Sequence, residues 1–173
     1  ATRLGVRLID LVGPEGAPAG AFTLAARGEP GAAPAAPAAG GYAQPDDVSM
    51  VLHTSGTTSR PKIVPLSQRN LAASATHIRN TLQFTAADCG LNIMPLFHIH
   101  GLIAATLSSL GAGAAVSCTP GFNALRFFAQ LEEVKPTWYT AVPTMHQAIL
   151  TRLRSHADAA KAARLRFIRS SSA

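Results

Sequence analysis

The chain has 173 residues, which is enough for one domain with a sizeable core. Hydrophobic residues make up 47% and charged residues only 14%, so we expect a large buried fraction or a face that packs against a partner. Cys89 and Cys118 are too few for a set of metal ligands, and we expect reduced structural thiols in a cytoplasmic protein.

The formal charge of +6 is unevenly placed, since seven Lys or Arg against one acid, Asp158, follow from Lys135 onward. Basic clusters can mark nucleic-acid sites. No aromatic interleaving or nucleic-acid motif accompanies this one, so we expect no nucleic-acid partner. The apolar stretch 99–118 is interrupted by His100 and by serines, which indicates a buried helix and strand and no membrane span.

The first part of the chain reads as a small separate piece. Alternation over 6–12 predicts a strand, Gly13 to Gly16 a turn, and 21–24 a second short strand. Residues 28–45 are almost wholly Gly, Ala and Pro, a composition too poor in bulky side chains to pack. We therefore predict edge strands in 1–27, a connection in 28–45 and an α/β core in 46–173.

The predicted core begins with two strands that flank a polar loop. Residues 48–54 form the first strand and 62–66 the return strand. Ser67 is expected to cap a helix with one apolar face. That face consists of Leu71, Ala75, Ile78 and Leu82.

Strands alternate with helices in the remaining sequence, which indicates an α/β fold with a largely parallel sheet. The predicted strands are 90–95, 114–118, 137–141 and 165–169. Predicted helices run from His100 to Leu110, from a cap at Asn123 to Pro136 with Leu125, Phe128 and Leu131 inward, and from Pro143 to His156. Trp138 and Tyr139 lie within a strand and are expected in the core. The chain has no Met at its start and stops at a predicted strand exit, so we expect a piece of a longer polypeptide.

The polar loop carries the strongest chemical signal. It reads Thr-Ser-Gly-Thr-Thr-Ser-Arg-Pro-Lys over 54–62. Such a loop between strands can turn backbone N–H groups inward as an anion-binding nest, with hydroxyls adding donors and a cation adding charge. The P-loop pattern of strand–helix NTPases cannot be fitted here. A polyphosphate site is one reading and a Ser/Thr-rich surface turn is the other.

Two ordered motifs resemble a known family. The loop 54–62 is similar to the phosphate loop of the adenylate-forming acyl-CoA synthetases, Thr-Ser-Gly-[Ser/Thr]-Thr-Gly-x-Pro-Lys-Gly. Met-Pro-Leu-Phe-His-Ile-His-Gly-Leu over 94–102 resembles a second signature of these enzymes at the expected distance. The resemblance runs from about Asp46 to the end. Ser59 and Ile63 stand where the family usually has Gly.

Within the family, the Ser-Arg version of the loop resembles that of the oxalate–CoA ligases, as does the run 138–144. The resemblance implies that ATP activates a carboxylate as an acyl-adenylate, which is then transferred to coenzyme A, with Mg²⁺ and fixed donors carrying the charge of pyrophosphate. A small acid, oxalate first, is the implied substrate. The remainder of the same polypeptide is an implied partner, and the piece alone is expected to be inactive.

The resemblance also implies site residues. Lys62 and His98 are the implied catalytic residues, while His98, His100, Gly101 and Ser171 would line the acyl route. The implied ATP-binding residues are Thr54, Ser55, Gly56, Thr57, Thr58, Ser59, Lys62, Ser171, Ser172 and Ala173. No metal ligands are predicted, because no Asp, Glu or Cys near His98 and His100 completes a site.

Other readings stay open. An isolated His such as His98 is more often a packed structural residue, and the serines at the end of the chain suit an ordinary polar strand end. A ligase for a fatty or aromatic acid is the alternative within the family, and apolar residues beyond His98 would favour it. From other classes, a non-catalytic nucleotide-binding module and a basic nucleic-acid-binding domain are the alternatives.

Overall fold

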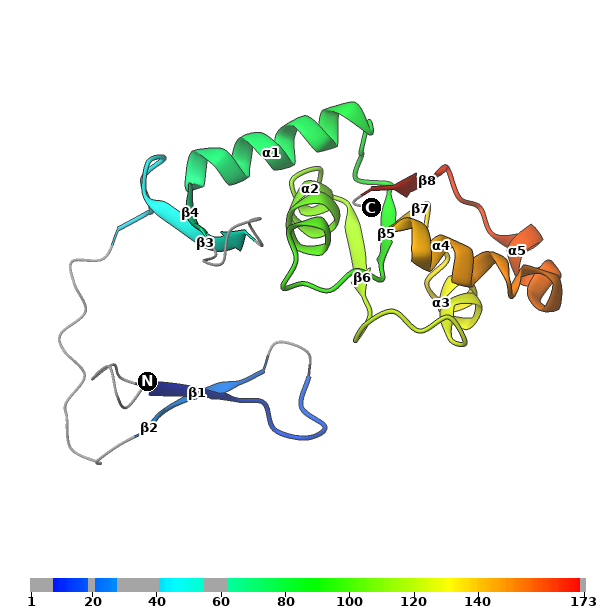
Figure 1. The fold of residues 1–173 in the computed structure, drawn as a ribbon, viewed down its shortest axis with the longest axis horizontal. Helices are drawn as coiled ribbons and strands as arrows, with labels where there is room; N and C mark the ends of the chain where they lie inside the picture. Colours follow the sequence, from blue (N-terminus) through cyan, green and yellow to red (C-terminus); the bar gives the residue numbers. More distant parts are fainter. Residues whose placement is uncertain (1–7, 19–20, 28–40, 55–61, 172–173) are drawn as a thin grey trace. The chain divides into compact units, whose positions relative to one another are not determined.

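The computed structural model describes residues 8–18, 21–27, 41–54 and 62–171, with a backbone description only for Thr54 (Figure 1). Two compact units divide the chain, 1–42 and 43–173. The predicted Gly/Ala/Pro connection falls largely outside the described residues. The serine, threonine and glycine positions of the loop from Ser55 to Ser59, and Ser172 and Ala173 at the end, also lie outside them.

The first unit contains one antiparallel hairpin. Strand β1 (Leu8–Val12) pairs with β2 (Thr23–Arg27), with Leu11 opposite Leu24. Arg27 donates through Nε and Nη2 to the two carboxylate oxygens of Asp10, at 2.8 and 2.9 Å. Both side chains are largely exposed, so this pair contributes at most about 1 kcal/mol to stability.

The second unit opens with the strands that flank the polar loop. Strand β3 (Val48–Thr54) pairs antiparallel with β4 (Lys62–Ser67), and the register sets Thr54 opposite Lys62. Both strands agree closely with the predicted bounds. The hairpin register therefore fixes where the loop 55–61 begins and ends.

Helix α1 (Gln68–Thr81) follows directly from β4. Ser67 caps it as predicted, because its hydroxyl accepts the N–H of Asn70 while the Asn70 side chain accepts the N–H of Ser67. The predicted apolar face is confirmed. Leu71, Ala75, Ile78 and Leu82 are each partly buried.

A four-stranded parallel sheet forms the centre of this unit, in the order β6-β5-β7-β8. Its strands are β5 (Cys89–Asn92), β6 (Ala115–Cys118), β7 (Trp138–Ala141) and β8 (Phe167–Ser170). Every pairing is parallel, which confirms the predicted α/β class. The two central strands are almost wholly buried, because helices cover both faces of the sheet.

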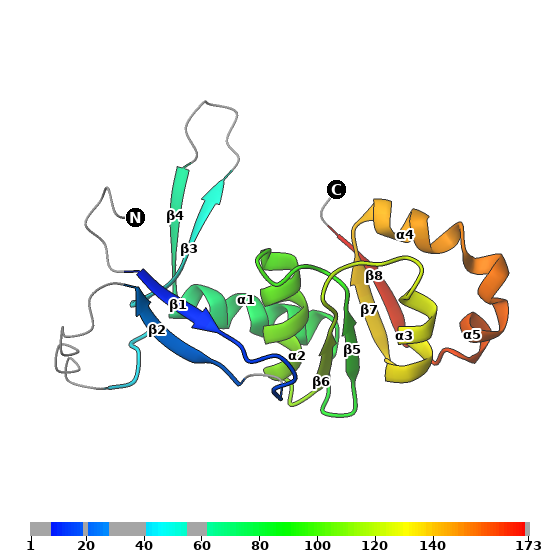
Figure 2. The ribbon, with the colours of Figure 1, turned by 90° about the horizontal axis from the view of Figure 1, so that it is seen from below.

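Helices lie on two sides of the sheet, as Figures 1 and 2 show. One side carries α1, the π-helix η2 (His100–Leu107) and the short α2 (Ser108–Leu110). The other carries α3 (Phe127–Val134), α4 (Pro143–Leu150), the 3-10 helix η3 (Leu153–His156) and α5 (Ala157–Ala162). No helix among the described residues has both the length and the apolar character needed to cross a lipid bilayer.

The core is divided between the two faces of the sheet. Trp138 is 1% exposed and packs with Phe84 and Ala105 on the α1 side, while Tyr139 packs on the α3 side. Successive strand residues point to opposite faces, which explains why neighbours in β7 serve different clusters. The prediction that both aromatic residues belong to the core is confirmed.

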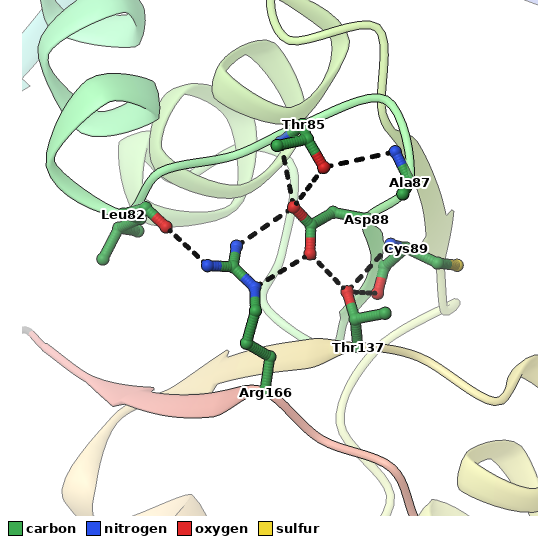
Figure 3. Close-up of polar contacts among 7 residues, drawn as sticks. All are labelled: Leu82, Thr85, Ala87, Asp88, Cys89, Thr137 and Arg166. Carbon is green, nitrogen blue, oxygen red and sulfur yellow. Dashed lines mark hydrogen bonds and ion pairs between the residues drawn. The ribbon is translucent and has the colours of Figure 1, made fainter.

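A network of hydrogen bonds connects the residues that directly precede β5, β7 and β8 (Figure 3). Asp88 is 5% exposed and accepts the Thr85 N–H at 2.9 Å and the Thr137 hydroxyl at 2.8 Å. Arg166 donates to both Asp88 oxygens at 3.1 and 3.0 Å, and to the Leu82 carbonyl at 3.1 Å. Burial raises the pKa of Asp88, but these hydrogen bonds and the Arg166 charge together hold that pKa below its ordinary value.

Several predicted boundaries were wrong. Strand β5 ends at Asn92 rather than Pro95, because the Asn92 side chain accepts the N–H of Met94 at 3.1 Å and turns the chain. The predicted helix from His100 to Leu110 is present, and it begins as the π-helix η2 before continuing as α2. Its Gly101 carbonyl accepts from the side chains of Asn92 at 3.1 Å and Thr106 at 2.9 Å, which compete with the helix for that acceptor.

The third predicted helix begins later than expected. The Asn123 side chain accepts the N–H groups of Leu125 and Arg126, so it caps a turn, and α3 starts only at Phe127. Leu125 is consequently 65% exposed and Phe127 takes the predicted inward place at 2%. Helix α4 ends at Leu150 rather than His156.

Strand β6 was expected to be buried but is only partly covered, since it lies at the edge of the sheet. Cys118 at its end is exposed.

Candidate functional site

The candidate site lies at the carboxyl ends of the parallel strands. His100 begins η2 shortly after β5, Thr140 is in β7, and Arg169 and Ser171 are at the end of β8. Because parallel strands end at one edge of a sheet, these polar side chains come together although the sequence separates them widely. Open α/β sheets place ligands at this edge.

A cavity of about 340 Å³ opens beside these residues. It lies between α1, η2 and the end of β8. Its polar lining residues are Asn70, Ser74, His100, Arg169 and Ser171, and its apolar ones are Leu66, Leu71, Ile78, Ile99, Ile103 and Ala104. Arg169 is the only Lys, Arg, Asp or Glu among these lining residues, so the cavity is mainly apolar with one fixed charge.

The guanidinium of Arg169 is held by three neutral neighbours. Its Nη1 lies 3.2 Å from His100 Nε2 and 3.4 Å from the Thr140 hydroxyl, and its Nη2 lies 3.2 Å from the Ser171 hydroxyl. Within the described part of the chain, no carboxylate lies within ion-pair distance of Arg169. Burial lowers the pKa of Arg169 below its ordinary value, yet an arginine stays charged at physiological pH.

His100 is 3% exposed and is fixed from one side. Its Nε2 lies 2.6 Å from the Thr140 hydroxyl. A guanidinium can only donate, so the contact with Arg169 makes Nε2 an acceptor and leaves the proton on Nδ1, which is buried and has no partner among the described residues. Burial, together with the charge of Arg169, lowers the pKa of His100 to about 4, so the imidazole is neutral at pH 7.

The structure places the other predicted site residues differently. His98 is exposed, is absent from the lining of this cavity, and accepts the His100 N–H through Nδ1 at 3.2 Å. Gly101 is buried and is not a lining residue either. A Cβ there would lie 2.4 Å from the Pro95 carbonyl oxygen, so the position requires glycine for close packing. Lys62 is exposed at the end of the hairpin.

Sequence reasoning missed Arg169 and Thr140. The sequence predicts only that both lie in strands. Arg169 could have been identified from the sequence. It lies at the carboxyl end of a predicted parallel strand, where α/β sheets bind ligands, and a run of serines follows it. Thr140 carried no such signal, because its position beside His100 depends on the register between β5 and β7.

The parallel sheet with helices on both sides and a cavity at its carboxyl edge defines an α/β protein with a candidate ligand cavity. The family described as AMP-binding enzyme matches residues 14–173, and the chain belongs to that family.

Two relatives and one solved structure show the extent of the similarity. The oxalate–CoA ligase of Arabidopsis thaliana is 53% identical over 131 residues, which are 75% of this chain and 25% of that protein. The oxalate–CoA ligase of Saccharomyces cerevisiae is 41% identical over 64% of this chain and 20% of its own length. A malonyl-CoA ligase with methylmalonyl-CoA and AMP bound matches with a TM-score of 0.68 and 33% identity, over 75% of this chain and 28% of its own. The chain thus spans a quarter or less of the two curated ligases.

Proposed function

We propose that this chain is part of an ATP-dependent acid–CoA ligase that forms AMP. In that reaction a carboxylate oxygen attacks the α-phosphorus of ATP, pyrophosphate leaves, and an acyl-adenylate results. The thiol of coenzyme A then attacks the acyl carbon, the thiol proton passes to solvent, and AMP departs. Membership of the AMP-binding enzyme family and similarity to CoA ligases support this proposal.

The proposed substrate is a small dicarboxylic acid, with oxalate first. The observation that carries this choice is the single fixed cation, Arg169, in a cavity whose other lining residues are neutral. An acidic group in such a cavity would gain charge-assisted hydrogen bonds. The names of the two oxalate–CoA ligases, and of the structurally similar malonyl-CoA ligase, agree with a small diacid.

ATP would be bound through the loop between β3 and β4. In this proposal the hydroxyl and backbone groups of 54–59 hold the leaving phosphates, and Lys62 adds a positive charge at the end of the loop. Ser171, with Ser172 and Ala173, would border the adenylate. No group of three or more potential ligands (His, Cys, Asp or Glu) occurs in the described part of the chain, so we propose that Mg²⁺ arrives with the phosphates of ATP.

A second candidate substrate is a fatty or aromatic acid. The apolar lining residues of the cavity from α1 and η2, among them Leu71 and Ile103, favour it, since they would cover a hydrocarbon chain or ring. His98, exposed two residues before η2, would be near the acyl carboxylate in either case. We place the enzyme in the cytoplasm, where the free thiols of Cys89 and Cys118 stay reduced.

Acid-dependent exchange of labelled pyrophosphate into ATP tests these proposals, because only a reversible adenylation step supports it. The enzyme that contains this chain should exchange pyrophosphate with oxalate or malonate and far less with octanoate or benzoate. A preference for octanoate or benzoate would favour the second candidate. Exchange with none of these acids would contradict the ligase proposal and leave a non-catalytic nucleotide-binding module.

A further inference from the structure

We propose that Arg169 is a specificity-determining residue that binds the carboxylate of the substrate that does not react. This inference rests on the proposed function, since it assumes that the cavity holds the acid. It assigns the choice of a dicarboxylate over a monocarboxylate to one side chain.

The charge of the cavity supports this role. His100 is neutral at pH 7 and the remaining lining residues have no charge, so Arg169 supplies the positive potential alone. A half-buried cation with no carboxylate among its described neighbours keeps an unsatisfied preference for an anion. The second carboxylate of a diacid would supply that anion, whereas a monocarboxylic acid would leave Arg169 unpaired beside an apolar group.

The hydrogen-bond geometry leaves donors available. A guanidinium has five N–H groups in a planar fork that matches a carboxylate. The contacts of Arg169 with described residues use Nη1 and Nη2 and none uses Nε. The fork therefore has N–H groups left for a ligand oxygen, while His100, Thr140 and Ser171 hold its plane.

Arg166, three residues earlier in the chain, has a different kind of partner. Both arginines belong to the same short segment. Arg166 donates through Nε and Nη2 to the two carboxylate oxygens of Asp88, at the opposite end of the sheet (Figure 3). Arg169 has neutral acceptors instead, one of which is a histidine kept uncharged by burial and by Arg169 itself.

The test is pyrophosphate exchange by the whole enzyme carrying Arg169→Gln, with the KM for oxalate and the KM for ATP measured in the same variant. We expect the KM for oxalate to rise about 30-fold or more, as for a truncated partner of a desolvated charge pair. The KM for ATP and the melting temperature should stay close to those of the parent. Arg154→Gln, at an exposed position in η3, is the matched control and should change neither KM.

Arg169→Lys provides a second test of the same KM values if the glutamine variant does not fold. It keeps the charge and loses the fork, so the KM for oxalate should rise about tenfold with the KM for ATP unchanged. A KM for oxalate within threefold of the parent in whichever variant folds would overturn the inference. Equal increases in the two KM values would also overturn it, because they would show a structural role. If the parent enzyme uses octanoate and neither diacid, the proposed substrate class is wrong. The proposed role of Arg169 is then wrong as well, because it depends on a second carboxylate.

Discussion

Lys62 is the one proposed phosphate-loop residue whose side chain the structure describes. It is exposed and lies opposite Thr54, where the hairpin ends and the loop begins. Lys62→Ala in the whole enzyme should slow pyrophosphate exchange about a hundredfold and weaken ATP binding much less, since charge grows on pyrophosphate as it leaves. Lys161→Ala, in α5, is the control. A rate within threefold of the parent would remove Lys62 from the proposed site.

His100 should give the chain a stability that depends on pH. Its pKa is about 4 in the folded chain and 6.5 ordinarily, so the unfolded chain takes up the proton first as the pH falls. The stability that neutral His100 contributes is therefore fully present above pH 6.5 and is lost as the pH falls to about 4.

Urea unfolding of the parent, His100→Gln and His77→Gln at pH 7 and pH 4.5 checks this. The His100 variant should lose part of the pH dependence, and the variant at the exposed His77 should keep it. Equal pH dependence in all three proteins would show that the His100 pKa is not lowered.

At the scale of elements, the Asp88 network holds β5, β7 and β8 in register at the end opposite the proposed site. Asp88→Asn should destabilise the chain by about 2 kcal/mol, which is below the usual cost of breaking a buried ion pair because the Arg166 side chain is 40% exposed. The Asp88 contribution is present above pH 3.8 and is lost as the pH falls through the lower folded pKa.

Asp46→Asn is the control for this change. Asp46 pairs with Arg69 at 3.0 Å, but both side chains are largely exposed, so the expected loss is at most about 1 kcal/mol. Denaturant unfolding measures both variants. A loss for Asp88→Asn no larger than that for Asp46→Asn would mean that the network does not stabilise the sheet.

Elements with a local signal were predictable from the sequence. The two strands that flank the polar loop and the helix capped by Ser67 were predicted nearly to the residue, because these signals depend on neighbours along the chain. The π-helix η2 was not predictable, since its Gly101 carbonyl is drawn away partly by Asn92, a residue from another element. The late start of α3 was not predictable either. The Asn123 side chain accepts the N–H groups of Leu125 and Arg126 and so caps a turn that precedes the helix.

At the scale of the whole molecule, the class of fold followed from the alternation of strands and helices, whereas the cavity did not. Its lining comes from α1, η2 and the end of β8, and only the strand order β6-β5-β7-β8 brings those parts together. Motifs in the sequence pointed to His98, His100 and Gly101, of which only His100 lines the cavity. The charge and hydrogen bonds of the cavity add Arg169 and Thr140.

In the reaction that we propose for the enzyme containing this chain, a carboxylate oxygen of the substrate attacks the α-phosphorus of ATP. Oxalate labelled with ¹⁸O, incubated with the enzyme, ATP, Mg²⁺ and coenzyme A, tests it by mass spectrometry of the nucleotide product. Because the thiol displaces AMP by breaking the bond between the acyl carbon and that oxygen, the AMP should carry one ¹⁸O atom. Unlabelled AMP, or ADP with labelled inorganic phosphate, would contradict the claim.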